Sequence, residues 1–84
     1  MDKGLYPALG ERVARLRRDL KITQEALAGR VGMSRATVAS IEAGRQRVTL
    51  DQAYQIASAL ELDSLAELVP LDVTRFEPIH ASMG

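Results

Sequence analysis

Apolar residues recur every three or four positions along most of the chain, in runs separated by short polar or glycine-containing breaks. This spacing places one apolar stripe on each of five amphipathic helices. The predicted helices cover residues 7–20, 24–31, 35–43, 50–60 and a short segment around 65–68. Their apolar stripes, which we expect to be buried, consist of Leu9, Val13, Leu16, Leu20, Leu27, Ala28, Val31, Val38, Ile41, Leu50, Ala53, Ile56, Ala57, Leu60, Leu65 and Leu68.

The breaks between these helices carry residues that begin and end helices. Thr23 and Ser34 precede the second and third helices, and their hydroxyls can accept hydrogen bonds from free backbone N–H groups. Gly32 and Gly44 follow the same two helices, and glycine adopts the left-handed conformation that ends a helix without steric cost. Residues 49–52, Thr-Leu-Asp-Gln, have the form of a capping box, which predicts the start of the fourth helix.

Two prolines mark the limits of the helical part. Pro7 suits the first helical position, because its fixed φ matches a helix and its missing N–H is not needed there. Pro70 is expected to stop the last helix. Beyond it, apolar and polar residues alternate over 71–74, which allows a short strand. The sequence therefore predicts a compact, all-α, five-helix domain over residues 1–69, followed by a short extended tail over residues 70–84.

The composition argues against several classes of function. The chain has no cysteine, and its one histidine, His80, has no other metal-ligand type nearby, so we expect no metal and no cofactor. No nucleophile–base pair, phosphate-cradling loop or paired carboxylates are recognisable, so we do not expect an enzyme. No apolar run approaches the ~20 residues that span a bilayer. The first residues lack the apolar core of a signal peptide, and we expect a cytoplasmic protein.

The net charge of zero conceals two oppositely charged halves. Residues 1–47 contain ten Lys and Arg against five Asp and Glu, a net charge of +5. Residues 48–84 contain one Arg against six Asp and Glu, a net charge of −5. The basic half holds the second and third predicted helices, as expected for a surface that binds phosphate groups. The alternative is ordinary solvated charge with no partner.

Residues 23–44, TQEALAGRVGMSRATVASIEAG, join two short helices through a glycine-containing turn. This is the sequence form of a helix-turn-helix, which places its second helix in the major groove of DNA. The longer run ERVARLRRDLKITQEALAGRVGMSRATVASIEAGRQRVTL resembles the lambda repressor/Cro-type, or XRE-type, helix-turn-helix regulators. The resemblance extends over about residues 9–68 and implies a lambda-repressor-like DNA-binding domain in which residues 35–43 form the recognition helix.

The resemblance also implies which residues meet DNA. Base contacts are expected from the recognition helix, at Arg35, Ala36, Thr37, Ala39 and Ser40. Arg35 can donate two hydrogen bonds to guanine O6 and N7, with phosphate contact as the alternative. The small residues either touch bases or only let the backbone approach closely. Phosphate contacts are expected from Gln24, Ser34, Arg45 and Arg47, although Gln24 has the alternative of being an ordinary polar residue of a first helical turn.

Two further sets of residues are expected to have structural roles. By alignment with the family, Arg17 and Glu42 form an ion pair between the first helix and the end of the third. The last helix and the tail hold more apolar residues than a short terminal helix needs, and the alternative to a dimer surface is that they complete the monomer's own core. The expected dimer interface consists of Leu65, Leu68, Val69, Leu71, Val73 and Phe76. Packing or interface roles are expected for the aromatic residues Tyr6, Tyr54 and Phe76.

These features predict a sequence-specific regulator of transcription, a repressor that binds a palindromic operator on double-stranded DNA as a homodimer. The alternative is an antitoxin-type or restriction-modification controller protein that autoregulates its operon. Such a protein would also bind a partner protein, such as a toxin, through residues 70–84.

Overall fold

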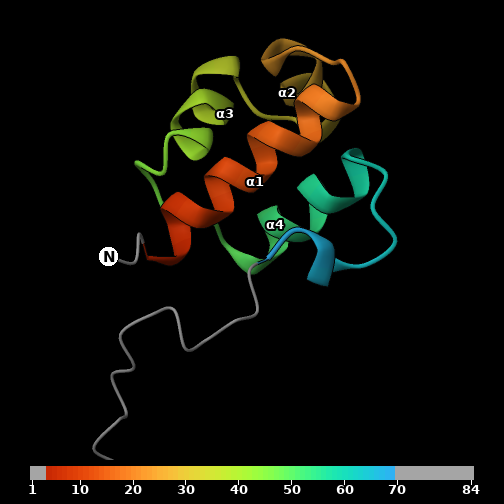
Figure 1. Cartoon of the computed structure of the whole chain (residues 1–84). Coiled ribbons are helices and arrows are strands. Elements are labelled where there is room, and N and C mark those ends of the chain that lie inside the picture. The colour runs from red at the N-terminus through yellow and green to blue at the C-terminus, as the bar shows by residue number, and fades with distance from the viewer. Residues whose placement is uncertain (1–3, 70–84) are drawn as a thin grey trace, which may run out of the picture.

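Helix α1 lies across the other elements in the computed structural model, which describes residues 4–69 of the chain (Figure 1). Every regular element among these residues is helical, in agreement with the predicted all-α class. The fifth predicted helix is only a single turn of 3-10 helix. In chain order the elements are α1 (Leu5–Asp19), α2 (Gln24–Val31), α3 (Arg35–Glu42), α4 (Leu50–Ala59) and the 3-10 turn η1 (Leu65–Glu67).

The predicted caps account for the starts of α2 and α4. The Thr23 hydroxyl accepts a hydrogen bond from the backbone N–H of Ala26 at 2.9 Å. Thr49 and Gln52 form the capping box, each side chain accepting from the other's backbone N–H at 3.0 Å. These bonds satisfy N–H groups that have no partner inside the helix, and they fix where each helix begins.

Helix α1 begins two residues earlier than predicted, at Leu5, so Pro7 is its third residue. Gly4 is the N-cap, with φ of 89° and no side-chain cap. The whole first turn of a helix lacks internal partners for its N–H groups, so a proline is tolerated there beyond the first position. At the other end, Leu20 follows the last helical residue, Asp19, and is 36% exposed, so it does not belong to the buried stripe.

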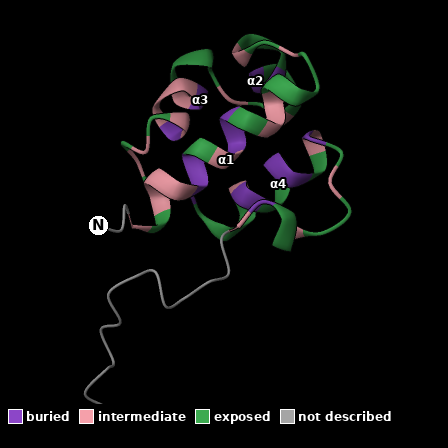
Figure 2. Cartoon of the chain, in the orientation of Figure 1, coloured by how far each residue is buried: buried purple, intermediate pink, exposed green. Residues whose placement is uncertain are grey.

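A single core lies between α1 and the other helices, and Figure 2 shows the buried faces of α1 and α4 turned inward. The predicted core differs from the observed core at two further residues, Leu50 and Val48. Leu50 is 73% exposed, because it lies about 70° from the centre of the α4 stripe, at the end of the helix. Val48, in the loop before α4, is buried and was not predicted. The core contains Leu9, Val13, Leu27, Ala28, Val38, Ile41, Val48, Ala53, Ile56, Ala57, Leu60 and Leu68.

Leu68 is a further correction, because it was expected in a dimer interface. Its side chain has no exposed area and completes the core of the monomer. Leu65 and Val69 are half-buried against the same core, so part of each side chain already packs within one chain. The expected strand and the remaining interface residues, Leu71, Val73 and Phe76, lie outside the described residues.

Close packing of α1 against the end of α3 depends on Gly10. A Cβ at this position would overlap the carbonyl oxygen of Ile41 and lie 2.8 Å from that of Glu42. We expect Gly10→Ala to lower the free energy of unfolding by about 1–3 kcal/mol, the usual cost of overpacking. Chemical denaturation measures the change.

Gly29 is the matched control for this substitution. It lies within α2, and an added Cβ would meet no atom within 4 Å. Gly29→Ala should therefore stabilise the domain by about 0.5–1 kcal/mol, because alanine has the higher helix propensity. Equal effects of the two substitutions would contradict the close contact assigned to Gly10.

Candidate nucleic-acid interface

The turn between α2 and α3 sets the angle at which the two helices meet. Gly32 ends α2 with φ of 68° and ψ of 29°, a left-handed conformation. The next N–H, of Met33, donates to the carbonyl of Ala28 at 3.0 Å, so the chain reverses within three residues. Helices α2 and α3 then pack directly against each other. This is the geometry of a helix-turn-helix.

Ser34 caps the start of α3, and the cap changes the expectation for its hydroxyl. The Ser34 Oγ accepts from the backbone N–H of Thr37 at 3.0 Å. The same hydroxyl donates to Thr37 Oγ1 at 2.9 Å. The Ser34 hydroxyl proton is therefore used in a hydrogen bond within the protein. The Thr37 hydroxyl accepts this bond, so its own proton is not used in it. Of these two residues, Thr37 is the better placed to donate a hydrogen bond outward.

Buried and exposed residues lie on different sides of α3, as the helical period predicts. Val38 and Ile41 are buried in the core. Arg35 and Ala36, in the first turn, are exposed. The other three positions predicted to contact bases are half-buried, namely Thr37, Ala39 and Ser40. The exposed members of this set therefore lie in the first turn, and the one long side chain among them belongs to Arg35.

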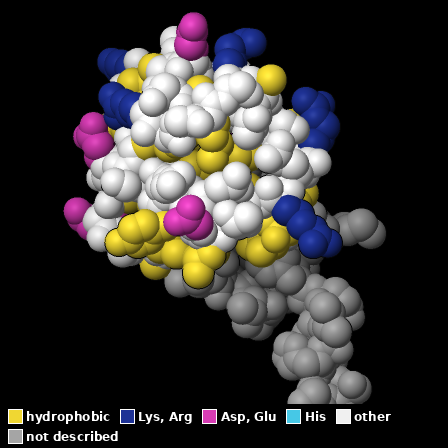
Figure 3. Space-filling model, turned by 180° about the vertical axis from the view of Figure 1, so that it is seen from behind, with side chains coloured by type: hydrophobic (Ala, Val, Ile, Leu, Met, Phe, Trp, Pro, Cys, Tyr) yellow, Lys and Arg dark blue, Asp and Glu magenta, His cyan; other side chains and the backbone are white. Residues whose placement is uncertain are grey.

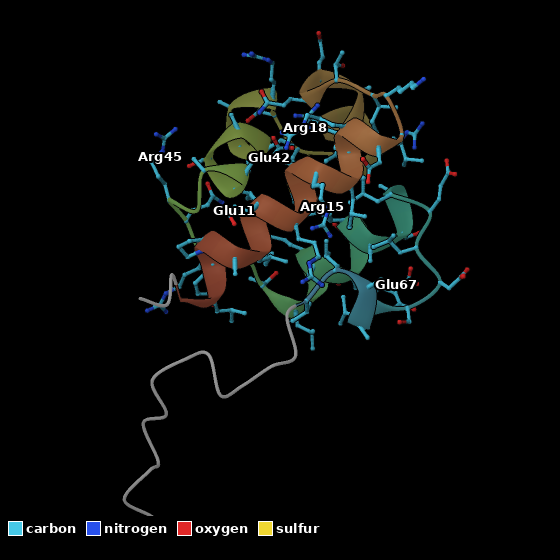
Figure 4. The ribbon with its side chains drawn as sticks, in the orientation of Figure 1. Glu11, Arg15, Arg18, Glu42, Arg45 and Glu67 are labelled. Atoms are coloured by element: carbon cyan, nitrogen blue, oxygen red, sulfur yellow. The ribbon has the colours of Figure 1, made fainter. Side chains whose placement is uncertain are left out.

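The loop after α3 carries Arg45 and Arg47, both exposed. The N–H of Gly44 donates to Ile41 O, and the N–H of Arg45 donates to Ser40 O, both at 3.0 Å. This paired arrangement ends the helix firmly and fixes the direction in which the loop leaves it. Arg45 extends away from the body of the domain (Figure 4). The backbone of Arg45, one of the two predicted phosphate-binding residues of this loop, is thus held against the end of the helix.

Arg17 and Glu42 come together where α1 meets the end of α3. Arg17 Nε lies 2.7 Å from Glu42 Oε2, and Arg17 NH2 donates to Glu42 Oε1 at 3.1 Å. Arg17 NH1 also donates to the carbonyl of Ile22 at 2.9 Å. The two side chains are 12% and 7% exposed. The pair is therefore bidentate and largely shielded from water, which makes it stronger than a surface ion pair.

Gln24 extends this cluster to α2. Its Nε2 donates to Glu42 Oε1 at 3.0 Å, so one carboxylate connects the first residue of α2 with α1 and α3. An amide nitrogen carries two hydrogens, and the second remains available to a phosphate. Arg17 also compensates the charge of Glu42, which would otherwise repel a nearby phosphate. The network both fixes Gln24 and removes a repulsive charge.

Several exposed cations lie on α1, on α3 and in the segments that follow these two helices. Among residues 4–69, their side chains make no hydrogen bond or ion pair, unlike those of Arg12, Arg17 and Arg30. They are available to an external anion such as the DNA backbone. These cations are Arg15, Arg18, Lys21, Arg35, Arg45 and Arg47.

Other kinds of site have no support in the described part of the chain. No three acidic or histidine side chains within residues 4–69 are grouped so that they could hold a metal ion. No helix in the same region is long and apolar enough to cross a membrane. The exposed arginines of α3 and of the loop after it are the clearest feature with a chemical use.

A family model described as helix-turn-helix matches residues 13–66, which is well over half of the chain. The chain belongs to the XRE-type helix-turn-helix family of DNA-binding transcriptional regulators. The match includes α2, the turn, α3 and α4, and therefore every residue of the interface described above.

Several proteins similar to this XRE-type chain are regulators. An uncharacterised HTH-type transcriptional regulator of Sinorhizobium fredii is 37% identical over 68 residues, covering 81% of this chain and 88% of that protein. The restriction-modification controller protein C.AhdI from Aeromonas hydrophila has a TM-score of 0.71 and 32% identity, covering 75% of this chain and 94% of that one. The clp gene regulator ClgR from Corynebacterium glutamicum has a TM-score of 0.76 and 27% identity, covering 80% of this chain and 86% of that one.

Two contacts in this interface were not predicted from the sequence. The hydrogen bond from Gln24 to Glu42 spans 18 residues, and no local pattern indicates it. The bond between Ser34 and Thr37 has a recognisable signal, because a cap residue and the residue three positions later lie side by side. Both contacts occupy polar groups that were also expected to contact DNA phosphates or bases.

Proposed function

We propose that the chain is a sequence-specific repressor that binds a palindromic operator on double-stranded DNA as a homodimer. The observation that carries this proposal is the exposed first turn of α3, where Arg35 has no partner among the described residues. Arg45 and Arg47 flank the same helix from the following loop. This combination offers one long side chain to the bases and two cations to the backbone.

The proposed mode of binding follows from these positions. Helix α3 enters the major groove, and Arg35 donates to O6 and N7 of a guanine. Thr37, Ala36, Ala39 and Ser40 line the remaining contact with the base edges. The Gln24 amide, Arg45 and Arg47 hold phosphates, which sets the register of the domain on the duplex. Thr37 is a better donor to DNA than Ser34, because the Ser34 proton is used in the bond to Thr37 Oγ1.

A palindromic operator follows from two-fold symmetry. Two copies of α3 read successive major grooves on one side of the duplex when they lie about 34 Å apart. A single copy reads only a few base pairs, and two copies double the length of the recognised sequence. Occupation of a promoter by such a dimer would block transcription, which is the simplest activity for a domain with no described catalytic group.

A second candidate is a controller protein that autoregulates its own operon. The observation that favours it is the similarity to C.AhdI, because the match covers 94% of the length of that protein. An antitoxin-type protein that binds a toxin-like partner through residues 70–84 belongs to the same candidate. Purification of the chain together with the product of its neighbouring gene tests this candidate, and a stable complex would favour it.

Salt dependence tests the proposed DNA contact. Arg45 and Arg47 give a dimer four cationic phosphate contacts, so log K should fall with log salt with a slope of about −4. Arg45→Ala should reduce the size of this slope by about 2, because a dimer loses two such contacts. Fluorescence anisotropy with a labelled duplex measures both values. Equal affinity for single-stranded DNA, or a slope near zero, would contradict the proposal.

A further inference from the structure

All four α-helices within residues 4–69 are followed closely by one residue in the left-handed conformation. After α2 and α3 this residue is a glycine, namely Gly32 with φ of 68° and Gly44 with φ of 74°. After α1 and α4 it is Lys21 with φ of 61° and Glu61 with φ of 63°. Residues other than glycine are strained in this conformation, so neither of these two side chains favours its turn.

The backbone of the two strained turns is bonded in the same way. The N–H of Lys21 donates to Arg18 O at 2.9 Å, and the N–H of Glu61 donates to Ser58 O at 3.0 Å. In each turn the next N–H donates to the carbonyl five residues before it, at 3.3 and 3.0 Å respectively. Because the backbones match, the two side chains can be compared directly.

The two side chains differ in their partners among the described residues. The Glu61 carboxylate lies 3.6 Å from Arg30 NH1, whereas the exposed Lys21 ammonium makes no hydrogen bond or ion pair within residues 4–69. Strained residues of this kind occur preferentially at functional sites. An unpaired ammonium on such a residue points to an external anion.

The turn that holds Lys21 is fixed relative to Gln24, the residue proposed to bind a phosphate. Arg17 NH1 donates to the carbonyl of Ile22, the residue after Lys21, at 2.9 Å. The same guanidinium pairs with Glu42, whose carboxylate also accepts from Gln24 at 3.0 Å. Lys21 is therefore held close to Gln24 by the network that orients the Gln24 amide.

Lys21 and the loop after α3 lie at opposite ends of α1. Gly44, where that loop begins, packs so closely on the first turn of α1 that a Cβ there would lie 2.6 Å from Pro7 Cα. Lys21 follows the last turn of α1, and the rise of the helix places these two points about 20 Å apart. Figure 3 likewise shows Lys and Arg side chains in separate groups around the edge of the domain.

This separation fits the two strands that border a major groove. The groove is about 12 Å wide, so its two phosphate backbones lie on either side of an inserted helix. With α3 in the groove, the loop arginines can hold one strand and Lys21 the other. Residues 18–25 carry two basic and two acidic side chains, so a direct contact, and not a general positive field, has to attract the backbone there.

We propose that the Lys21 ammonium binds a phosphate of the strand that lies across the major groove from the strand held by Arg45 and Arg47. The proposal rests on the proposed DNA-binding function and adds a contact residue to it. It gives a use to a lysine at a position where glycine would fold with less strain. With one further contact per copy, the salt slope of a dimer becomes about −6 instead of the −4 or so that Arg45 and Arg47 alone give.

Lys21→Gly tests the proposal, because stability and DNA affinity should change in opposite directions. Glycine relieves the strain, so the melting temperature of the full chain should rise. Loss of the ammonium should weaken binding to the operator enriched from random duplexes at least about 10-fold and reduce the size of the salt slope by about 2. Thermal denaturation and fluorescence anisotropy measure the two effects.

A neutral phosphate in the operator locates the contact. Methylphosphonate linkages are placed one at a time along both strands, and binding of each duplex is measured. At one position a neutral linkage should weaken binding of the wild type and leave Lys21→Gly unaffected, because that variant has no cation to lose there. The position at which Arg45→Ala is unaffected should lie on the other strand.

Three variants serve as controls. Glu61→Gly relieves the same strain after α4 and should leave operator affinity unchanged. Lys21→Arg keeps the charge and should keep the salt slope. Arg15→Ala removes another exposed cation of α1 and should not change the slope, because Arg15 lies about 140° round the helix from Gly10, which contacts α3.

Three results would overturn the proposal. If Lys21→Gly bound the operator as tightly as the wild type while Arg45→Ala bound it weakly, the Lys21 contact would be wrong and the proposed function would stand. A lower melting temperature for Lys21→Gly would show that the lysine supports the fold. Absence of selective duplex binding by the wild-type chain would remove the proposed function itself, and the Lys21 contact with it.

Discussion

Replacing Arg17 with alanine should lower the free energy of unfolding by about 3 kcal/mol. The substitution leaves the Glu42 carboxylate, which is only 7% exposed, without its cationic partner. Loss of one partner from a shielded ion pair costs about 3–5 kcal/mol, and the remaining bond from Gln24 offsets part of this. Urea denaturation followed by circular dichroism measures the change, and an unchanged melting temperature would contradict the structural role of Arg17.

Arg30 provides the matched control. Its contact with Glu61 is 3.6 Å long, and both side chains are substantially exposed. Arg30→Ala should therefore cost less than about 1 kcal/mol, as exposed pairs generally do. A double substitution, Arg17→Met with Glu42→Leu, removes both charges and should recover most of the stability lost in Arg17→Ala.

Arg17→Ala should also weaken DNA binding, by more than its effect on folding explains. Without Arg17, an uncompensated Glu42 lies against Gln24, at the start of α2 where a phosphate is proposed to bind. Binding should be measured at a temperature where all variants are fully folded. The double variant should then bind better than Arg17→Ala, because it has no carboxylate to repel the phosphate.

Replacing Arg35 with alanine should reduce operator affinity by about 1–3 kcal/mol per half-site and relax the preference at one base pair. Arg35 is exposed in the first turn of α3 and has no partner among residues 4–69, so its loss should leave folding unchanged. Titration of the operator and of its single-base variants shows whether the preference is lost at one position only.

Arg45→Ala is the control for this prediction, because Arg45 lies in the loop and is assigned to the backbone. It should weaken binding to all duplexes about equally. If Arg35→Ala also weakened every duplex equally, Arg35 would be a phosphate contact, and the direct reading of guanine would be wrong.

The helices and their ends were largely predictable, because local chemistry determines them. Thr23, Thr49 and Gly32 act through neighbours within four residues, and each begins or ends a helix where expected. The start of α1 was less predictable, since a proline is tolerated throughout the first turn. Local signals therefore place helix ends to within about two residues.

Contacts between distant segments were less accessible from the sequence. The apolar character of Leu50 and Leu68 is the same, yet one is exposed and the other is fully buried. Leu50 lies at the edge of the α4 stripe, whereas Leu68 follows the short turn η1, and the elements that pack beside each residue complete the difference. The bond from Gln24 to Glu42 likewise depends on how α2 and α3 meet.

The composition of α3 limits how much sequence the protein can read directly. Apart from Arg35, the positions proposed to face bases carry only small side chains: Ala36, Thr37, Ala39 and Ser40. Such residues provide few hydrogen bonds to base edges. Specificity should therefore depend strongly on the spacing of half-sites and on the deformability of the DNA between them.

Selection of bound sequences from a pool of random duplexes shows whether α3 reads the operator as proposed. We expect enrichment of an inverted repeat with a guanine in each half-site and with half-site centres about one helical turn apart. Selection with Arg35→Ala should retain the spacing and lose that guanine. A pool that shows no enrichment, or a guanine that persists without Arg35, would contradict the assignment of α3 as the reading element.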